Sequence, residues 1–233
     1  MTSIKIISKE EFLKKNKKPN QEKVWDNIAK SVEKRDFFKV REINAVNEFL
    51  KDKKGLVIDL GCGAGWNMVP SKDILYYGID SSKESIKLTK KRAEKKDVKA
   101  RLFKGNATKL DKKIFKDEMF DYGLFIATLH CIEGEKERLN ALKEFYRILK
   151  KGAEALITIW NSEDERFDNI KNKGDIYMSW KQGKKSFMRY YYLFSEKEFL
   201  NLLKSVGFKI LEINSKETDR FSKKNWIVRI GKQ

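Results

Sequence analysis

The chain has 233 residues, of which 40% are hydrophobic, a length and composition that suit one large domain with a sizeable core. No apolar run is long enough to span a membrane, and residues 1–7 lack the apolar core of a signal peptide. Cys62 and Cys131 lie far apart without metal-ligand spacing, which excludes a disulfide framework and predicts a reducing compartment. We therefore expect a soluble, cytoplasmic protein with no membrane partner and no bound metal.

The net charge is +18, from 52 Lys and Arg residues against 34 Asp and Glu residues. Such an excess of positive charge attracts polyanions. Only ten of the 52 cations are Arg, and enrichment in Lys also accompanies genome composition or growth at high temperature. The charge by itself therefore leaves a nucleic-acid partner and a compositional bias equally open.

The expected elements begin with an N-terminal helical extension over residues 1–50. It comprises an exposed, Lys-rich lead-in at 9–20 and helices at 21–31 and 37–51. The expected apolar strands and the helices between them are strands 56–60, 75–79, 100–103, 120–126 and 153–160 and helices 82–94 and 135–149. Continuous apolar strands that alternate with helices indicate a parallel sheet covered on both faces.

The alternation ends after residue 160. Residues 161–194 are charged and aromatic without a clear period. An irregular segment of this length inside a compact domain is usually functional, so we expect a substrate-side insertion here.

The last part of the chain returns to regular patterns. A helix at 195–206 is expected, with Ser195 as its N-cap. Strands at 208–213 and 226–230 follow, and we expect them to form an antiparallel hairpin, spanning 207–231, at the sheet edge.

The most informative motif follows the first expected strand, where the sequence reads DLGCGAG. Glycines there let the backbone turn tightly and approach a ligand closely. The spacing is G-x-G-x-G, not the G-x-G-x-x-G of dinucleotide binders, and Trp66 and Asn67 follow where a phosphate loop needs Gly-Lys-Ser/Thr. Both nucleotide interpretations are therefore disfavoured. The candidate cofactor-binding residues of this turn are Asp59, Gly61, Cys62, Gly63 and Gly65.

Asp80 closes the second strand, at the edge where open α/β sheets bind ligands. A strand-end Asp alone is more often a helix cap, but with the glycine turn upstream we favour an acceptor for the two hydroxyls of a ribose. Asn106, after the third strand, could hydrogen-bond an adenine edge or serve as an ordinary turn residue, and both interpretations stay open. The remaining candidate cofactor-binding residues are Ser81, Ala107 and Ala127.

The glycine turn, Asp80, the FDY strand and the LKKG turn resemble, in order and spacing, the class I S-adenosylmethionine-dependent methyltransferases over roughly residues 50–160. The resemblance implies one Rossmann-like α/β methyltransferase domain over residues 1–233. Its seven-stranded sheet would be mostly parallel with an antiparallel last strand and helices on both faces, and its cofactor would be S-adenosylmethionine. Two positions depart from the common pattern: Asn106 stands where Asp is usual, and Ala153 replaces the second glycine of a Gly-Gly turn.

The flanking segments resemble one subfamily, the tRNA methyltransferases that esterify wobble 5-carboxymethyluridine. These include eukaryotic-type tRNA methyltransferase 9 and the methyltransferase domain of AlkB homologue 8. The segments are VWDNIA, ATLHC, RYYYLF and NW, of which Arg189-Tyr190-Tyr191 is the most specific. Family members often have His where Tyr192 and Cys131 stand. The resemblance implies the tRNA anticodon loop as substrate and a small zinc-binding activator protein as partner.

A carboxylate acceptor sets simple requirements for methyl transfer. Its reference pKa is about 4, so it is anionic at neutral pH and needs no general base. The site must align the acceptor and exclude water. Arg189 beside Tyr190 suits this task, because guanidinium pairs bidentately with carboxylate and tyrosines can stack on an anticodon base. The alternative is that residues 190–194 only pack the insertion against the sheet.

His130, the only histidine, follows the fourth strand, in the loop that faces the transferable methyl group in this fold. We expect it to position the acceptor, and to act as a base only for a neutral hydroxyl or amine. A structural role is the alternative. The candidate catalytic residues are thus His130, Arg189 and Tyr190. Trp25 and Trp180 are further aromatic candidates for the acceptor pocket, with core packing favoured for Trp25.

Three functions compete. The favoured one is S-adenosylmethionine-dependent methylation of the carboxylate of wobble 5-carboxymethyluridine. The second is a small-molecule or protein methyltransferase of the same fold, in which residues 161–194 would form a closed cap with few outward cations. The third is a non-catalytic RNA-binding scaffold, against which the intact glycine turn and Asp80 argue.

Overall fold

The structure is a computed structural model that describes residues 4–36, 44–170, 173–183, 185–213 and 224–233. The elements in chain order are β1 (Ile6–Ser8), α1 (Lys9–Leu13), α2 (Gln21–Asp36), α3 (Asn44–Leu50), β2 (Gly55–Leu60), β3 (Ile74–Asp80), α4 (Lys83–Lys95), β4 (Ala100–Lys104), β5 (Phe120–Ile126), the 3-10 helix η1 (Leu129–Cys131), α5 (Glu135–Ile148), β6 (Leu149–Trp160), the 3-10 helix η2 (Glu165–Phe167), β7 (Asp175–Gln182), β8 (Lys185–Tyr192), α6 (Glu196–Val206), β9 (Phe208–Ile213) and β10 (Asn225–Lys232). None of the helices in the described part of the chain is long and apolar enough to cross a membrane.

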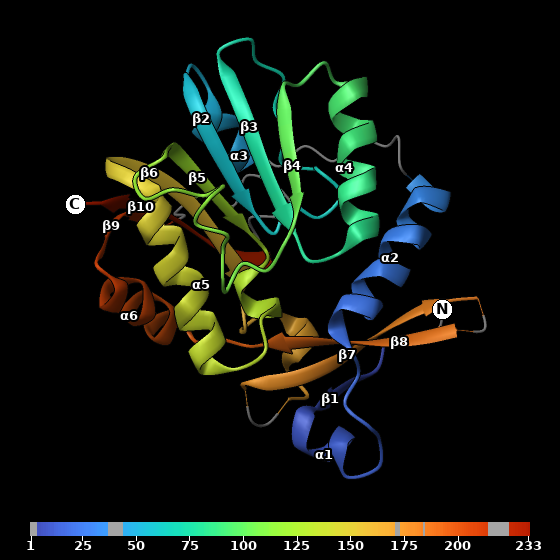
Figure 1. Cartoon of the computed structure of the whole chain (residues 1–233). Coiled ribbons are helices and arrows are strands. Elements are labelled where there is room, and N and C mark those ends of the chain that lie inside the picture. Colours follow the sequence, from blue (N-terminus) through green and yellow to red (C-terminus); the bar gives the residue numbers. More distant parts are fainter. Residues whose placement is uncertain (1–3, 37–43, 171–172, 184, 214–223) are drawn as a thin grey trace.

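The large sheet has seven strands in the order β4-β3-β2-β5-β6-β10-β9 (Figure 1). Strands β2 to β6 pair in parallel with one another, and β10 runs antiparallel between β6 and β9. This order confirms the expected mostly parallel sheet and the C-terminal hairpin. The hairpin's second strand lies inside the sheet, and β9 forms the edge.

Helices cover both faces of the large sheet, as expected. On one face, α5 and α6 bury Phe145 and Phe199 against a core that includes Ile58 and Phe125. On the other face, α3 contributes Val46 and its neighbours to a second core that contains β2 and β3 residues, and α4 adds to the same core. The change of strand order between β2 and β5 opens a crevice at their carboxyl ends, the position at which such sheets bind ligands.

Local residues mark three of the helix ends. Ser82 caps α4 by accepting a hydrogen bond from the Ser85 amide, and Ser195 caps α6 by accepting one from Glu198. Gly207 ends α6 in the left-handed conformation, with a φ of 106° that favours glycine. Caps depend on neighbouring residues alone, and for that reason they can be read from sequence.

The sequence predicted a helix at 135–149 and a strand at 153–160, separated by the LKKG turn. Instead, β6 begins at Leu149, directly after α5, and includes these residues. The pairing register with β5 shifts between Phe120 and Tyr122, which accommodates the extra residues as an irregularity in the ladder.

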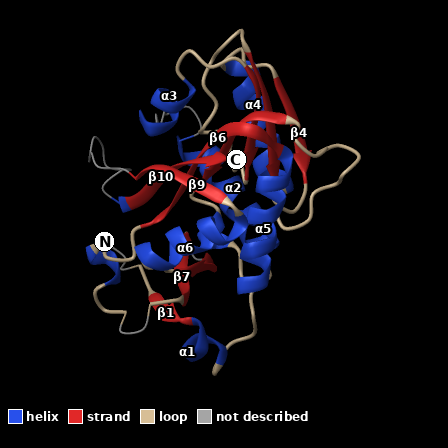
Figure 2. Ribbon diagram, turned by 90° about the vertical axis from the view of Figure 1, so that its left-hand side faces the viewer, coloured by secondary structure: helices blue, strands red, loops and turns tan. Residues whose placement is uncertain are grey.

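The expectation of an irregular insertion at 161–194 was wrong. Its second half forms the antiparallel hairpin β7–β8, and β1 from the N-terminus pairs with β7 to complete a three-stranded sheet. In Figure 2, β1 and β7 lie next to α1 and apart from the large sheet. The extension at 1–50 is therefore not purely helical. The pairing of Ile6 with Met178 joins residues distant in sequence, which no local pattern reveals.

The expected helix at 37–51 is present as α3, from Asn44. Residues 37–43 of that prediction lie outside the described residues.

Candidate active site

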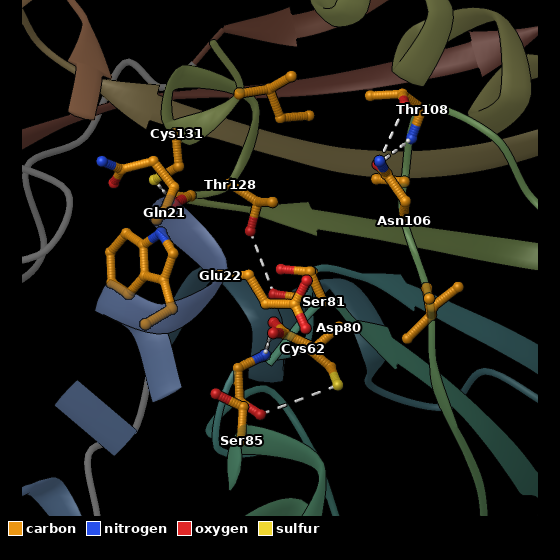
Figure 3. A pocket seen from close by; sticks show the side chains of 18 of the residues that line it. Gln21, Glu22, Cys62, Asp80, Ser81, Ser85, Asn106, Thr108, Thr128 and Cys131 are labelled. Atoms are coloured by element: carbon orange, nitrogen blue, oxygen red, sulfur yellow. Dashed lines mark hydrogen bonds between the residues drawn. The ribbon is translucent and has the colours of Figure 1, made fainter. Parts of the chain in front are cut away.

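A cavity of about 530 Å³ lies at the carboxyl ends of β2, β3, β4 and β5. Figure 3 shows side chains from these strand ends and from α2 around it. Eight of the ten predicted cofactor-binding residues line the cavity: Gly61, Cys62, Gly63, Asp80, Ser81, Asn106, Ala107 and Ala127. The structure thus brings together residues that four separate strands carry. Their contacts with a cofactor remain predictions.

The glycine turn has the backbone that its sequence predicts. Gly61, Gly63 and Gly65 all have φ between 53° and 77°, in the left-handed region. A Cβ on Gly61 would lie 2.2 Å from the Thr128 side chain, whereas a Cβ on Gly63 would meet nothing within 4 Å. Gly61 is therefore required by the fold, and Gly63 leaves open space at the wall of the cavity.

Asp80 is held in place by backbone amides. Its Oδ2 accepts a hydrogen bond from the Gly63 amide at 2.9 Å, and its Oδ1 accepts one from the Ser82 amide at 2.8 Å. Burial raises the pKa of Asp80 to about 6, so the side chain is still an anion at pH 7. Each carboxylate oxygen has lone pairs for a further donor, as the two hydroxyls of a ribose require.

Asp59 and Gly65 do not line the cavity. Asp59 is fully buried, and its Oδ2 accepts hydrogen bonds from Asn67 Nδ2, at 3.0 Å, and from the Tyr76 hydroxyl. Burial raises the pKa of Asp59 to about 7. A Cβ on Gly65 would lie 2.6 Å from Met68. Asp59 and Gly65 therefore support the glycine turn without facing the cavity.

Asn106 forms a turn in this structure. Its Oδ1 accepts hydrogen bonds from the Thr108 amide at 2.9 Å and from the Thr108 hydroxyl at 3.0 Å. Both lone pairs of that oxygen are then engaged. The structure therefore favours the interpretation of Asn106 as a turn residue over that of an acceptor for adenine, although Asn106 does line the cavity.

Helix α2 forms the wall opposite the strand ends, and of its lining residues the sequence had suggested Trp25, as an aromatic candidate for the acceptor pocket. Its contribution comes from Gln21, Glu22 and Trp25. Asp26 joins α2 to the start of α4, because its Oδ1 accepts hydrogen bonds from the Ser82 hydroxyl at 2.7 Å and from the Glu84 amide at 3.2 Å. The helical pattern predicted the helix, but the polar contacts that place it have no sequence signal.

His130 lies in η1 and is only 1% exposed. Its ring centroid is 5.0 Å from that of Trp160 and 5.6 Å from that of Tyr191. Neither ring nitrogen has a hydrogen-bond partner among the described residues, and burial lowers the pKa of His130 to about 3. His130 does not line the cavity, whereas its neighbours Thr128 and Cys131 do.

Tyr190 also lies away from the cavity. Its side chain is fully buried, and its hydroxyl donates a hydrogen bond to Asp175 and accepts one from Arg138 Nη1 at 3.1 Å. A buried ring cannot stack on an RNA base. The structure therefore assigns Tyr190 to the packing of the three-stranded sheet, as the alternative interpretation of residues 190–194 had it.

Arg189 lies one layer of side chains behind the cavity wall. Its guanidinium carbon is 5.0 Å from the Trp180 ring centroid and 5.2 Å from that of Tyr191. The Tyr191 ring in turn lies 6.2 Å, in an edge-on arrangement, from the ring of Trp25, which lines the cavity. The Nε atom of Arg189 is buried and has no partner within the described part of the chain.

Comparison with known families places the chain. Residues 51–207 match the family described as methyltransferase domain, and the chain belongs to this family. The fold is that of a class I methyltransferase, and the cofactor is S-adenosylmethionine. The residues present fit that group, because the glycine turn leaves room at Gly63 and Asp80 presents a fixed anionic acceptor beside it.

The relatives of this chain include an uncharacterized protein and tRNA methyltransferases. An uncharacterized protein from Methanocaldococcus jannaschii is 31% identical over 185 residues, covering 78% of each chain. The tRNA (carboxymethyluridine(34)-5-O)-methyltransferase of Schizosaccharomyces pombe is 24% identical over 72% of this chain and 80% of its own. The enzyme of that activity from Xenopus tropicalis is 33% identical over 122 residues, or 52% of this chain, and the match spans only 18% of its length.

Solved structures show the same fold. A SAM-dependent methyltransferase from Methanosarcina mazei has a TM-score of 0.66 and 24% identity, covering 82% of this chain and 99% of its own. The CcbJ methyltransferase from Streptomyces caelestis has a TM-score of 0.67 and 15% identity, covering 92% of this chain and 100% of its own.

Proposed function

We propose that this methyltransferase esterifies the carboxylate of 5-carboxymethyluridine at the wobble position of the tRNA anticodon. The proposal is supported by relatives that carry this activity in their names and by the motifs around Arg189. The observation that carries it is the unpartnered, buried Nε of Arg189 behind the cavity wall. A buried N–H donor without a partner is costly, and an anionic acceptor is a partner that suits it, although the rest of the guanidinium also contacts the Tyr191 hydroxyl.

The cofactor side of the cavity would hold S-adenosylmethionine through the glycine turn and Asp80. Bound there, S-adenosylmethionine supplies a methyl group carried on a sulfonium. Asp80 would accept hydrogen bonds from the ribose hydroxyls, and Gly63 would allow the ligand to approach the backbone closely. Trp25 and Ile126 contribute apolar surface that limits the access of water.

The acceptor side depends on how β8 is attached to α2. The side chain of Gln21 donates a hydrogen bond from Nε2 to the Met188 carbonyl at 3.2 Å and accepts one from the Tyr190 amide at 2.9 Å. These two bonds fix the backbone on both sides of Arg189, and Gln21 itself lines the cavity. Arg189 would therefore orient a carboxylate, which needs no general base at neutral pH. His130, buried and neutral, would act through Tyr191 as a positioning residue.

The test is mass spectrometry of tRNA nucleosides from cells that lack the protein. We expect methoxycarbonylmethyluridine to disappear and carboxymethyluridine to accumulate. Wild-type protein should restore the ester, and the Asp80→Ala variant should not. A normal level of methoxycarbonylmethyluridine in the deleted strain would reject the proposed function.

The family resemblance supports a second proposal, that a small zinc-binding activator protein associates with this chain. The test is turnover by the purified chain with and without that partner. Full turnover by the chain alone would contradict a required activator.

A further inference from the structure

The β7–β8 hairpin has two faces of different character, because side chains alternate along each strand. One face, here called the platform face, carries Ile176, Met178 and Trp180 from β7 and Lys185, Phe187, Arg189 and Tyr191 from β8. Ile176, Met178 and Tyr191 at its inner end are buried in one core cluster, and its outer end carries Trp180, Phe187 and Lys185. The opposite face is covered near α1, where Phe12 packs against Tyr177 with ring centroids 4.6 Å apart. In Figure 1 the hairpin lies below the lower end of α2.

Aromatic and basic side chains alternate along β8 on the platform face, and they are accessible at its outer end, whereas Tyr191 at the inner end is only 2% exposed. Trp180 and Phe187 are directly opposite each other in the strand register, and both side chains are half-buried. Lys185 is exposed at the turn end. The indole nitrogen of Trp180 donates a hydrogen bond to the Ser31 hydroxyl of α2 at 3.3 Å, which fixes the ring on a rigid element.

The platform face leads from solvent to the cavity. Lys185 lies at its outer end, and Tyr191 at its inner end contacts Trp25 in the cavity wall. The seven residues from Lys185 to Tyr191 span about 20 Å of extended strand. Arg189 lies between the aromatic pair and the cavity.

The charge of this segment is strongly positive. Residues 170–193 contain six Lys and Arg residues against one acidic residue, Asp175. Asp175 belongs to the opposite face by alternation, and its carboxylate accepts a hydrogen bond from Tyr190. Lys185 and Arg189 are the cations that β7 and β8 place on the platform face, and neither strand places an acidic residue there, so its complement is an anionic ligand with planar groups.

We propose that the platform face binds single-stranded RNA, with bases stacked on Trp180 and Phe187 and phosphate groups near Lys185. This inference rests on the proposed function, and it adds the path by which the acceptor nucleotide reaches the cavity. Every base has a π-face, so stacking on aromatic side chains tolerates any sequence, and nearby cations follow the RNA backbone. Binding of a protein partner would require neither alternating aromatic rings and cations nor a surface that leads toward the cavity.

The experiment compares matched substitutions on the two faces of the hairpin. Phe187→Leu and Lys185→Ala alter the platform face, and Met188→Leu and Lys181→Ala are the controls on the opposite face. Leucine keeps part of the apolar volume of Phe187 and removes its π-face, and at this partly exposed position we expect folding to be preserved. The probe is a labelled anticodon stem-loop RNA, and its dissociation constant is measured by fluorescence anisotropy at several salt concentrations.

We expect Phe187→Leu to weaken RNA binding about fivefold or more, the loss that removal of one stacked base implies. Lys185→Ala should reduce the slope of log affinity against log salt by roughly 0.7, because one phosphate contact is lost. Both controls should stay within about twofold of wild type, and affinity for S-adenosylmethionine should be unchanged in all four variants, as expected for surface positions far from the cofactor.

Wild-type affinity in both platform variants would overturn the proposal, and so would an equal loss in the controls or a failure of the wild type to bind the RNA. Methyl transfer to the same RNA containing 5-carboxymethyluridine is measured separately. If the wild type binds through the platform face but does not methylate this RNA, the proposed function is rejected while the platform stands. If the wild type methylates this RNA normally and Phe187→Leu binds the RNA as tightly as wild type, the platform face is rejected while the proposed function stands.

Discussion

The amide of Gly63 donates a hydrogen bond to Oδ2 of Asp80 at 2.9 Å, and this contact joins the glycine turn after β2 to the end of β3. The Ser82 amide holds the other carboxylate oxygen at 2.8 Å. The orientation of Asp80 toward the cavity is therefore set by the backbone before any ligand binds. Preorganised acceptors of this kind lose little conformational entropy on binding.

Replacing Asp80 with Ala should reduce the affinity for S-adenosylmethionine at least about tenfold, because hydrogen bonds to a charged group are lost. Isothermal calorimetry measures this directly. Asp73→Ala is the matched control, since Asp73 is exposed and precedes the opposite end of the same strand. Unchanged affinity in Asp80→Ala would reject the ribose assignment.

Substitution of Gly61 and of Gly63 should affect folding and cofactor binding differently. A Cβ at Gly61 would overlap Thr128, so Gly61→Ala should lower the free energy of unfolding by about 2–4 kcal/mol. A Cβ at Gly63 meets nothing within 4 Å, so Gly63→Ala should cost only about 1 kcal/mol and weaken cofactor binding instead. Denaturant titration measures the free energy of unfolding of both variants, and calorimetry measures their affinity for S-adenosylmethionine. Equal destabilisation of the two would contradict the geometry.

Replacing Arg189 with Ala should lower kcat/KM for the carboxymethyluridine RNA by roughly tenfold to a hundredfold, the loss expected for a charge-assisted hydrogen bond. Affinity for S-adenosylmethionine should be unchanged. Arg189→Lys should recover little, because an ammonium lacks the bidentate fork of guanidinium. A parallel loss of cofactor binding in Arg189→Ala would indicate a role in folding instead.

His130 should make folding sensitive to acid. Its pKa is about 3 in the folded protein and about 6.5 when exposed, so below pH 6.5 the unfolded chain binds a proton that the folded protein excludes. Stability from this group is therefore complete above pH 6.5 and declines as the pH falls toward 3.

The His130→Phe variant keeps an aromatic ring and removes this titration. Between pH 6.5 and 5 the wild type should lose about 2 kcal/mol of unfolding free energy more than the variant. Denaturant unfolding at several pH values tests this, and carboxylates common to both proteins cancel in the difference. Parallel pH curves for the two proteins would disprove the buried, neutral state of His130.

Much of the fold could be predicted because its signals are local. Apolar strands alternating with helices indicated the parallel sheet, and Ser82, Ser195 and Gly207 marked helix ends through contacts with residues at most four positions away. The glycine turn and Asp80 follow the same logic, because strand ends of a parallel sheet meet at one edge whatever the rest of the chain does.

The acceptor side could not be predicted in this way. Tyr190 and Arg189 are adjacent in sequence, yet alternation along β8 turns them to opposite faces. The burial of each face depends on what packs against it, which is α1 on the Tyr190 face and the core cluster around Tyr191 on the Arg189 face. The pairing of β1 with β7 joins distant parts of the chain, and α2 reaches the cavity through the polar contacts of Asp26 and Gln21.

By itself, the sequence determined the class of fold, the helix caps, the glycine turn and the anion at the end of β3, because each depends on neighbours in the chain or on the common edge of parallel strands. Only the tertiary structure decided that α2 closes the cavity, that Tyr190 and His130 are buried, and that Trp180, Phe187 and Arg189 share one face. Those outcomes depend on which surfaces exclude water from one another, and burial of that kind is a property of the whole packed chain.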